Sequence, residues 1–75
     1  MSTPLRAGLI GAGFIGSVHA HAIRSSGARL TRVSNSTPDR SAEAAQRLGA
    51  RAPAESAEAL IASDDVDVVH ICTPN

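Results

Sequence analysis

A glycine-rich segment near the N-terminus constrains this chain most. It reads G-x-G-x-x-G, with Gly11, Gly13 and Gly16, and it lies between an apolar run at residues 5–10 and a segment with helical spacing. After a strand, the first glycine makes a tight turn, the second lets the backbone approach a pyrophosphate, and the third lets the helix pack closely on the sheet. The N–H groups and dipole at the helix N-terminus then favour phosphate. The segment therefore predicts a dinucleotide-binding turn.

Composition narrows the class of protein. The 75 residues allow one compact unit, and seven arginines without any lysine balance seven acidic residues. The arginines are spread along the sequence and form no basic stripe, which argues against nucleic acid or a membrane surface as partner. No apolar run approaches the length of a membrane span and no signal peptide is evident, so a cytoplasmic protein is expected.

No metal site is expected either. A lone cysteine, Cys72, excludes an internal disulfide and a cysteine-built zinc site. His19 and His21 are two residues apart on a predicted helix and point in different directions, so they are expected to be structural or solvated. His70 lies within a predicted strand, where a packed, hydrogen-bonded histidine is expected.

Apolar periodicity and turn residues predict four strands alternating with three helices. The first helix is expected to bury Phe14, Ile15, Val18, Ala22 and Ile23, and the second, capped by Thr37 and ended by Gly49, to bury Ala42, Ala45 and Leu48. Pro53 is expected to close the third strand. This alternation predicts a parallel, Rossmann-type α/β sheet that is incomplete, with strand order 3-2-1-4. The expected elements are strands at 5–10, 28–33, 51–52 and 66–72, and helices at 14–26, 38–48 and 55–62.

The end of the second strand bears on the choice of cofactor. NAD-specific sites place Asp or Glu there to bind the ribose 2′-hydroxyl. Here the segment reads Ser34, Asn35 and Ser36, with no carboxylate before Asp39. Because these side chains do not repel a 2′-phosphate and Arg40 follows one turn into the helix, NADP is favoured slightly over NAD. The alternative is that the loop only caps the helix and Arg40 is solvated.

Four segments carry a resemblance to a known family. They are Gly8–Gly16 with Val18 and His19; the helix start at residues 37–40 with Ala44, Leu48 and Gly49; residues 65–69; and Ile71-Cys72-Thr73-Pro74-Asn75. With these motifs the chain resembles the N-terminal Rossmann domain of the Gfo/Idh/MocA oxidoreductases. The resemblance implies that the N–H groups of Phe14 and Ile15 lie against the pyrophosphate. It also implies that Thr73, Pro74 and Asn75 lie against the ribose or pyrophosphate.

The same resemblance limits the function that is expected of residues 1–75. Members of the family are two-domain enzymes that move a hydride between NAD(P) and a sugar, polyol or related compound. Their catalytic lysine lies in a Glu-Lys-Pro motif beyond the Thr-Pro-Asn loop, and a C-terminal α/β domain builds most of the substrate site. Residues 1–75 thus resemble the N-terminal part of the NAD(P)-binding domain, with the substrate domain absent. No catalytic residue is expected among them.

Other readings of the chain stay open. It can be a non-catalytic or truncated nucleotide-binding module, or a fragment that does not fold alone. The strand at residues 66–72 is apolar and would lie at the edge of the sheet. An unpaired apolar edge promotes self-association, so association of two copies through this strand is expected.

Overall fold

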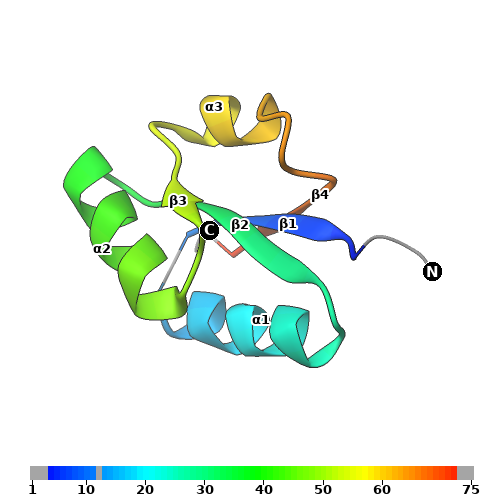
Figure 1. Ribbon diagram of the computed structural model, residues 1–75. Coiled ribbons are helices and arrows are strands. Elements are labelled where there is room, and N and C mark those ends of the chain that lie inside the picture. The colour runs from blue at the N-terminus through cyan, green and yellow to red at the C-terminus, as the bar shows by residue number, and fades with distance from the viewer. Residues whose placement is uncertain (1–3, 12, 73–75) are drawn as a thin grey trace.

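The computed structural model describes residues 4–11 and 13–72, which form a parallel sheet flanked by helices (Figure 1). The four strands lie in the order β3-β2-β1-β4, and each pairs in parallel with its neighbour. This confirms the predicted incomplete Rossmann-type fold and its strand order. The elements are β1 (Arg6–Ile10), α1 (Phe14–Ser25), β2 (Arg29–Ser34), α2 (Pro38–Leu48), β3 (Ala52–Pro53), α3 (Ala57–Ile61) and β4 (Val68–Ile71).

The molecule has three layers. Helices α1 and α2 cover one face of the sheet and α3 lies over the other (Figure 1). The core between the sheet and the first two helices is built from aliphatic side chains, because the chain has a single aromatic residue. Its buried members are Ala7, Leu9, Ala20, Ile23, Leu30, Val33, Ala44, Ala45 and Leu48.

The ends of α2 follow from its sequence. The hydroxyl of Thr37 accepts a hydrogen bond from the backbone N–H of Arg40 at 3.1 Å, which satisfies one of the free donors at the helix start. The helix ends at Gly49, whose φ of 74° lies in the left-handed region that favours glycine. Both predicted signals are confirmed.

The buried face of α1 differs from the prediction. Of the residues predicted to be buried, Ile23 is buried, whereas Phe14 is 81% exposed, Val18 is 51% exposed, and Ile15 and Ala22 are exposed as well. The other buried residues of the helix are Gly16 and Ala20. Glycine and alanine at successive turns let the helix axis approach the sheet closely. The first turns of the helix therefore pack through small residues, with Ile23 buried near its end, and the bulky side chains at its start are turned outward.

Two further predictions were wrong, one about a buried residue and one about the end of a strand. Ala42 on α2 is exposed, whereas Ser41 and Ala44 are buried. Pro53 is part of β3 and pairs with Val33 instead of closing the strand. Because β3 lies at the edge of the sheet, the missing N–H of the proline leaves no ladder partner unsatisfied.

The second face of the sheet depends on a close contact at Gly8. Leu60 of α3 is fully buried and lies directly over β1. A Cβ at position 8 would come within 2.6 Å of a methyl carbon of Leu60. Glycine in the middle of β1 therefore allows α3 to seat on this face.

Polar contacts fix β4 beside β1. The Arg6 guanidinium donates to both carboxylate oxygens of Asp67, at 2.8 and 3.0 Å, and the Arg6 backbone N–H donates to the same carboxylate. Further along, Nδ1 of His19 on α1 lies 3.3 Å from Nδ1 of His70 on β4, with the rings edge to face. One ring must donate and the other accept. The expected hydrogen-bonded histidine at position 70 is confirmed.

We expect stability to depend on pH through Asp67. The Arg6 guanidinium lowers the pKa of this carboxyl from 3.8 to about 2. The folded state therefore gains stability from the ionised carboxylate above pH ~4, and loses it as the pH falls toward 2. Thermal unfolding of Asp67→Asn should show a lower Tm than the unsubstituted chain near neutral pH. The difference should shrink in acid.

Asp64→Asn serves as the control, because Asp64 is an exposed carboxylate of the same turn. Its unfolding should follow that of the unsubstituted chain. Equal Tm values for Asp67→Asn and the unsubstituted chain near neutral pH would contradict the assigned role of the ion pair.

Candidate functional site

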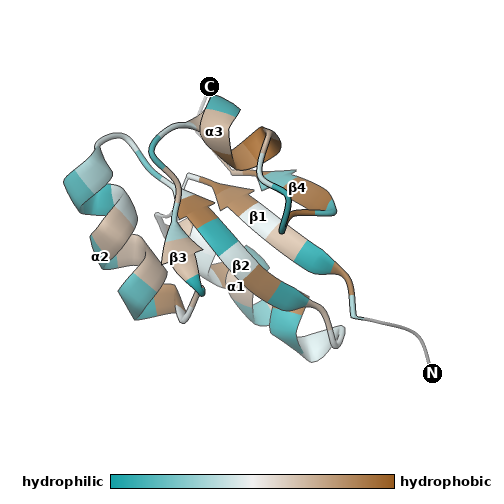
Figure 2. Cartoon of the chain, turned by 45° about the horizontal axis from the view of Figure 1, so that its top comes forward, coloured by the Kyte–Doolittle hydropathy of each residue, from teal (hydrophilic) through white to brown (hydrophobic). Residues whose placement is uncertain are grey.

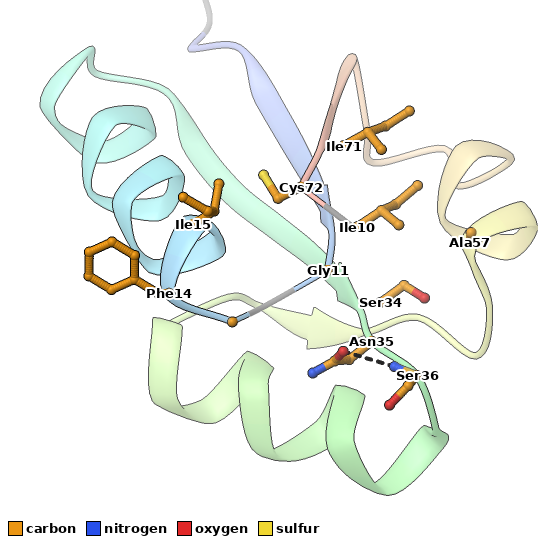
Figure 3. Close-up of a pocket in the computed structure, with 11 residues that line it drawn as sticks. Ile10, Gly11, Phe14, Ile15, Ser34, Asn35, Ser36, Ala57, Ile71 and Cys72 are labelled. Carbon is orange, nitrogen blue, oxygen red and sulfur yellow. Dashed lines mark hydrogen bonds between the residues drawn. The ribbon is translucent and has the colours of Figure 1, made fainter. Parts of the chain in front are cut away.

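The main cavity opens at the carboxyl ends of the strands (Figure 3). Its volume is about 740 Å³, within the usual range for small-molecule sites. In open α/β sheets, ligands bind at this edge, where the strand order reverses. The lining residues are Ile10, Gly11, Gly13, Phe14, Ile15, Ser34, Asn35, Ser36, Ala57, Ile71 and Cys72.

Two of the three motif glycines are required by the fold itself. Gly11 has a φ of 86°, and its N–H donates to the carbonyl oxygen of Ser34 at 2.8 Å, which joins the ends of β1 and β2. A Cβ on Gly16 would lie 2.7 Å from the carbonyl oxygen of Gly11. Gly16 therefore lets α1 start directly against the turn, although Gly16 itself does not line the cavity.

Gly13 differs from both. Its φ is −73°, which any residue can adopt, and apart from its chain neighbours no described residue lies within 4 Å of the position that a Cβ would take. The protein's own packing thus gives no reason for glycine at this position. The open space in front of it belongs to the cavity, so the bare backbone is accessible to a ligand.

The start of α1 is also unlike the other helix starts. Thr37 and Ser56 cap α2 and α3 with side-chain hydrogen bonds, and each of those helices has an acidic residue in its first turn. Helix α1 has Gly13 at its N-cap position, without a side-chain cap, and no acidic residue in its first turn. The first N–H groups of a helix lack intrahelical partners and carry partial positive charge. This terminus can therefore accept an anion from the cavity.

The loop after β2 is held by a buried serine. The hydroxyl of Ser41 accepts from the N–H of Asn35 at 2.7 Å and donates to the carbonyl oxygen of Thr37 at 2.9 Å. The N–H of Ser36 donates to Oδ1 of Asn35 at 2.9 Å (Figure 3). Sequence reasoning missed Ser41, because a serine in the second turn of a helix is ordinarily solvated and carries no signal of its own.

Arg40 lies in a second hollow that adjoins the first. This hollow measures about 520 Å³, and both hollows are lined by Gly13 and Asn35. The backbone N–H of Arg40 serves the Thr37 cap, and its side chain is exposed. Arg47 pairs with Glu43 at 3.1 Å on the same helix. The hollow therefore carries both signs of charge, with arginines and carboxylates on α2.

Four lining residues were not predicted. Ile10, Ile71 and Cys72 come at the ends of strands, and Ala57 starts α3; Figure 3 shows Ile10 and Ile71 pointing toward that helix. The three residues at strand ends could have been predicted from the sequence, because ligands bind at the carboxyl ends of parallel strands. Ala57 could not, because its position depends on how α3 packs. Burial raises the pKa of the Cys72 thiol, which therefore stays neutral at ordinary pH.

The remaining predicted residues fall in two groups. The side chains of Phe14 and Ile15 are 81% and 53% exposed, so only their backbones are suited to the phosphate role; Figure 3 shows the Phe14 ring directed away from the glycine turn. The loop Thr73, Pro74 and Asn75 lies outside the described residues.

Within residues 4–11 and 13–72, no three His, Cys, Asp or Glu side chains are placed to hold a metal ion. The described part of the chain also contains no helix long and apolar enough to cross a membrane.

The fold and the glycine turn together define a Rossmann-type nucleotide-binding domain. Residues 5–75 match the model of the Gfo/Idh/MocA family, described as an oxidoreductase family with an NAD-binding Rossmann fold, and the chain belongs to this family. A search of curated proteins found no significant match.

Solved structures agree with the family assignment. A levoglucosan dehydrogenase in complex with NADH and L-sorbose superposes with a TM-score of 0.91 at 30% identity, over 99% of this chain. An NAD-binding oxidoreductase from Klebsiella pneumoniae gives 0.87 at 33% identity, also over 99%. A provisionally assigned myo-inositol dehydrogenase from Sinorhizobium meliloti 1021 gives 0.76 at 39% identity, over 93%. The present chain covers 22%, 22% and 21% of these structures' chains, respectively.

Proposed function

We propose that this chain is the cofactor-binding part of an NAD(P)-dependent oxidoreductase that acts on a sugar, a polyol or a related compound. The proposal depends mainly on Gly13. The fold does not require glycine at this position, and the backbone there is exposed to the main cavity. The uncapped start of α1 supports it. So does the NADH bound in the similar levoglucosan dehydrogenase.

In this proposal, different groups of residues bind different parts of the cofactor. The N–H groups of Phe14 and Ile15 donate to the pyrophosphate, whose negative charge the dipole of α1 stabilises. Ser34, Asn35 and Ser36 line the part of the cavity expected to take the adenosine ribose, and Thr73, Pro74 and Asn75 contact the ribose or pyrophosphate. The bound nicotinamide supplies the carbon that gives or accepts the hydride.

Catalysis requires more than these residues. The described cavity lining offers aliphatic side chains, one phenyl ring, serine and asparagine groups and a neutral thiol, none of which is suited to exchange a proton with a substrate hydroxyl at neutral pH. We expect the 75-residue polypeptide to bind the dinucleotide without oxidising sugars. Under the alternative function, a non-catalytic nucleotide-binding module, a longer protein containing this chain would also bind the cofactor without turnover.

The glycine turn gives a direct test. Gly13→Ala should weaken dinucleotide binding by roughly tenfold or more, because the added methyl group keeps the phosphate away from the N–H groups at the start of α1. A hydrogen bond to a charged phosphate contributes about 1.5–3 kcal/mol. Its free energy of unfolding should change by at most about 1 kcal/mol. Gly16→Ala should instead lower the free energy of unfolding by about 1–3 kcal/mol, because its methyl group meets the Gly11 carbonyl. Calorimetric titration and denaturant unfolding measure the two effects.

The result that opposes the proposal is equally specific. If Gly13→Ala folds and binds the dinucleotide as tightly as the unsubstituted chain, then the bare backbone at this position has no part in binding.

Cofactor choice is the finer part of the proposal, and we favour NADP over NAD. No carboxylate lies at the end of β2, and Arg40 borders the adjoining hollow. Arg40→Ala should weaken NADP binding by about tenfold and leave NAD binding unchanged. Asn35→Asp should favour NAD, because a carboxylate repels the 2′-phosphate and accepts from a ribose hydroxyl. Separate titrations with the two cofactors measure this.

Arg51→Ala is the matched control for Arg40→Ala, because Arg51 lies before β3, at the other end of the strands. It should leave both affinities unchanged. A clear preference of the unsubstituted chain for NAD would refute the NADP assignment and leave the dinucleotide site intact.

We also propose that the 75-residue polypeptide self-associates through β4. Among the described strands β4 pairs with β1 alone, and its Val68 and Ile71 are 40% and 69% exposed. Figure 2 shows that β4 is largely apolar in colour. Such an edge can pair with a second copy.

Size-exclusion chromatography at increasing concentration should show dimers or larger species. Val68→Lys should shift them toward monomer, because a charged lysine opposes edge pairing. Ile61→Lys is the matched control, since Ile61 is 59% exposed but lies on α3. A monomer at every concentration would count against association through this edge.

A further inference from the structure

Four of the seven arginines gather at the end of the sheet opposite the glycine turn. Arg6 and Arg29 begin β1 and β2, Arg51 precedes β3, and Arg24 lies in the last turn of α1. They are far apart in sequence, but parallel strands begin at the same edge of a sheet. The four line a hollow of about 400 Å³ with Ala28, Leu30, Thr31 and Gly49.

Two of these arginines already have partners. Arg6 pairs with Asp67 at 2.8 Å, and Arg24 donates to the carbonyl oxygen of Leu48 at the end of α2. The side chains of Arg29 and Arg51 are exposed, and neither forms an ion pair or hydrogen bond with a described residue. The hollow therefore has two guanidinium groups with unused donors.

The charge around the hollow stays positive after the nearby negative groups are counted. Asp67 neutralises one of the four arginines. The C-termini of α1 and α2 lie at this edge, and each contributes about half a negative charge. Asp64 lies near Arg51 across a neighbouring hollow and reduces the charge further, while Asp65 is occupied by Arg32 at 3.0 Å. Roughly one to two positive charges remain.

We propose that this arginine hollow binds a small phosphate-type dianion. Guanidinium groups match tetrahedral oxyanions well, because their planar donors form paired hydrogen bonds. The bound group is either free phosphate or the phosphate of a small ester, and the two share the same chemistry. The inference is independent of the dinucleotide cavity, because the two sites have no lining residue in common.

The test is a titration of the 75-residue chain with inorganic phosphate and, separately, with glycerol 3-phosphate, followed by two-dimensional amide NMR. Saturable shifts are expected at Arg29, Leu30, Gly49 and Arg51. Whichever compound binds more tightly identifies the source of the phosphate group. Sodium chloride at matched ionic strength should produce much smaller shifts at these amides.

Variants complete the test. The double variant Arg29→Gln/Arg51→Gln should raise the dissociation constant roughly tenfold or more. Arg40→Gln, near the other end of the strands, should leave it unchanged. Both replaced side chains are exposed and pair with no described residue, and thermal unfolding of the double variant should confirm that it folds.

Three results would overturn the proposal. One is an equal response to chloride and phosphate, which would indicate only general screening of a basic surface. The second is phosphate binding that the double variant retains, and the third is shifts confined to Gly13 and Phe14. None of these results bears on dinucleotide binding, which is measured separately.

Discussion

The close approach of α1 to the end of β1 determines the geometry of the cavity. The helix starts so near the turn that a single added methyl group at Gly16 would meet the carbonyl oxygen of Gly11. The same turn donates its N–H to Ser34, which fixes the end of β2 relative to β1. One steric constraint thus aligns a helix terminus with two strand ends. That alignment leaves the backbone at Gly13 open to the cavity.

Much of the fold could be predicted from the sequence, because its signals are local. Thr37 and Gly49 mark the ends of α2 by capping chemistry, and alternating strands and helices determine a parallel sheet with few possible orders. The buried face of α1 was not predictable in the same way. Periodicity placed the large residues Phe14 and Val18 inside, but packing density favours the small residues that let the helix approach.

The candidate site shows a similar division. The glycine turn and the loop after β2 were identified from the sequence, since turn chemistry and strand ends can be read from it. Ser41 and Ala57 were not, because their roles depend on contacts that arise only after α2 and α3 have packed. The clustering of arginines was also missed, although the predicted strand order placed Arg29 and Arg51 near the starts of neighbouring strands. The position of Arg24 beside them depends on how α1 packs on the sheet.

The contacts between α1 and its neighbours have a consequence for motion. Between described residues, arginine hydrogen bonds join α1 to α2 from Arg47 to Ser17 and from Arg24 to Leu48. Between α1 and β4, the described residues form a single side-chain hydrogen bond, which joins the rings of His19 and His70. Local opening of a protein occurs where neighbouring elements are joined by the fewest contacts. We therefore expect the two large helices to move as one body, and fluctuations that widen the cavity to occur on its β4 side.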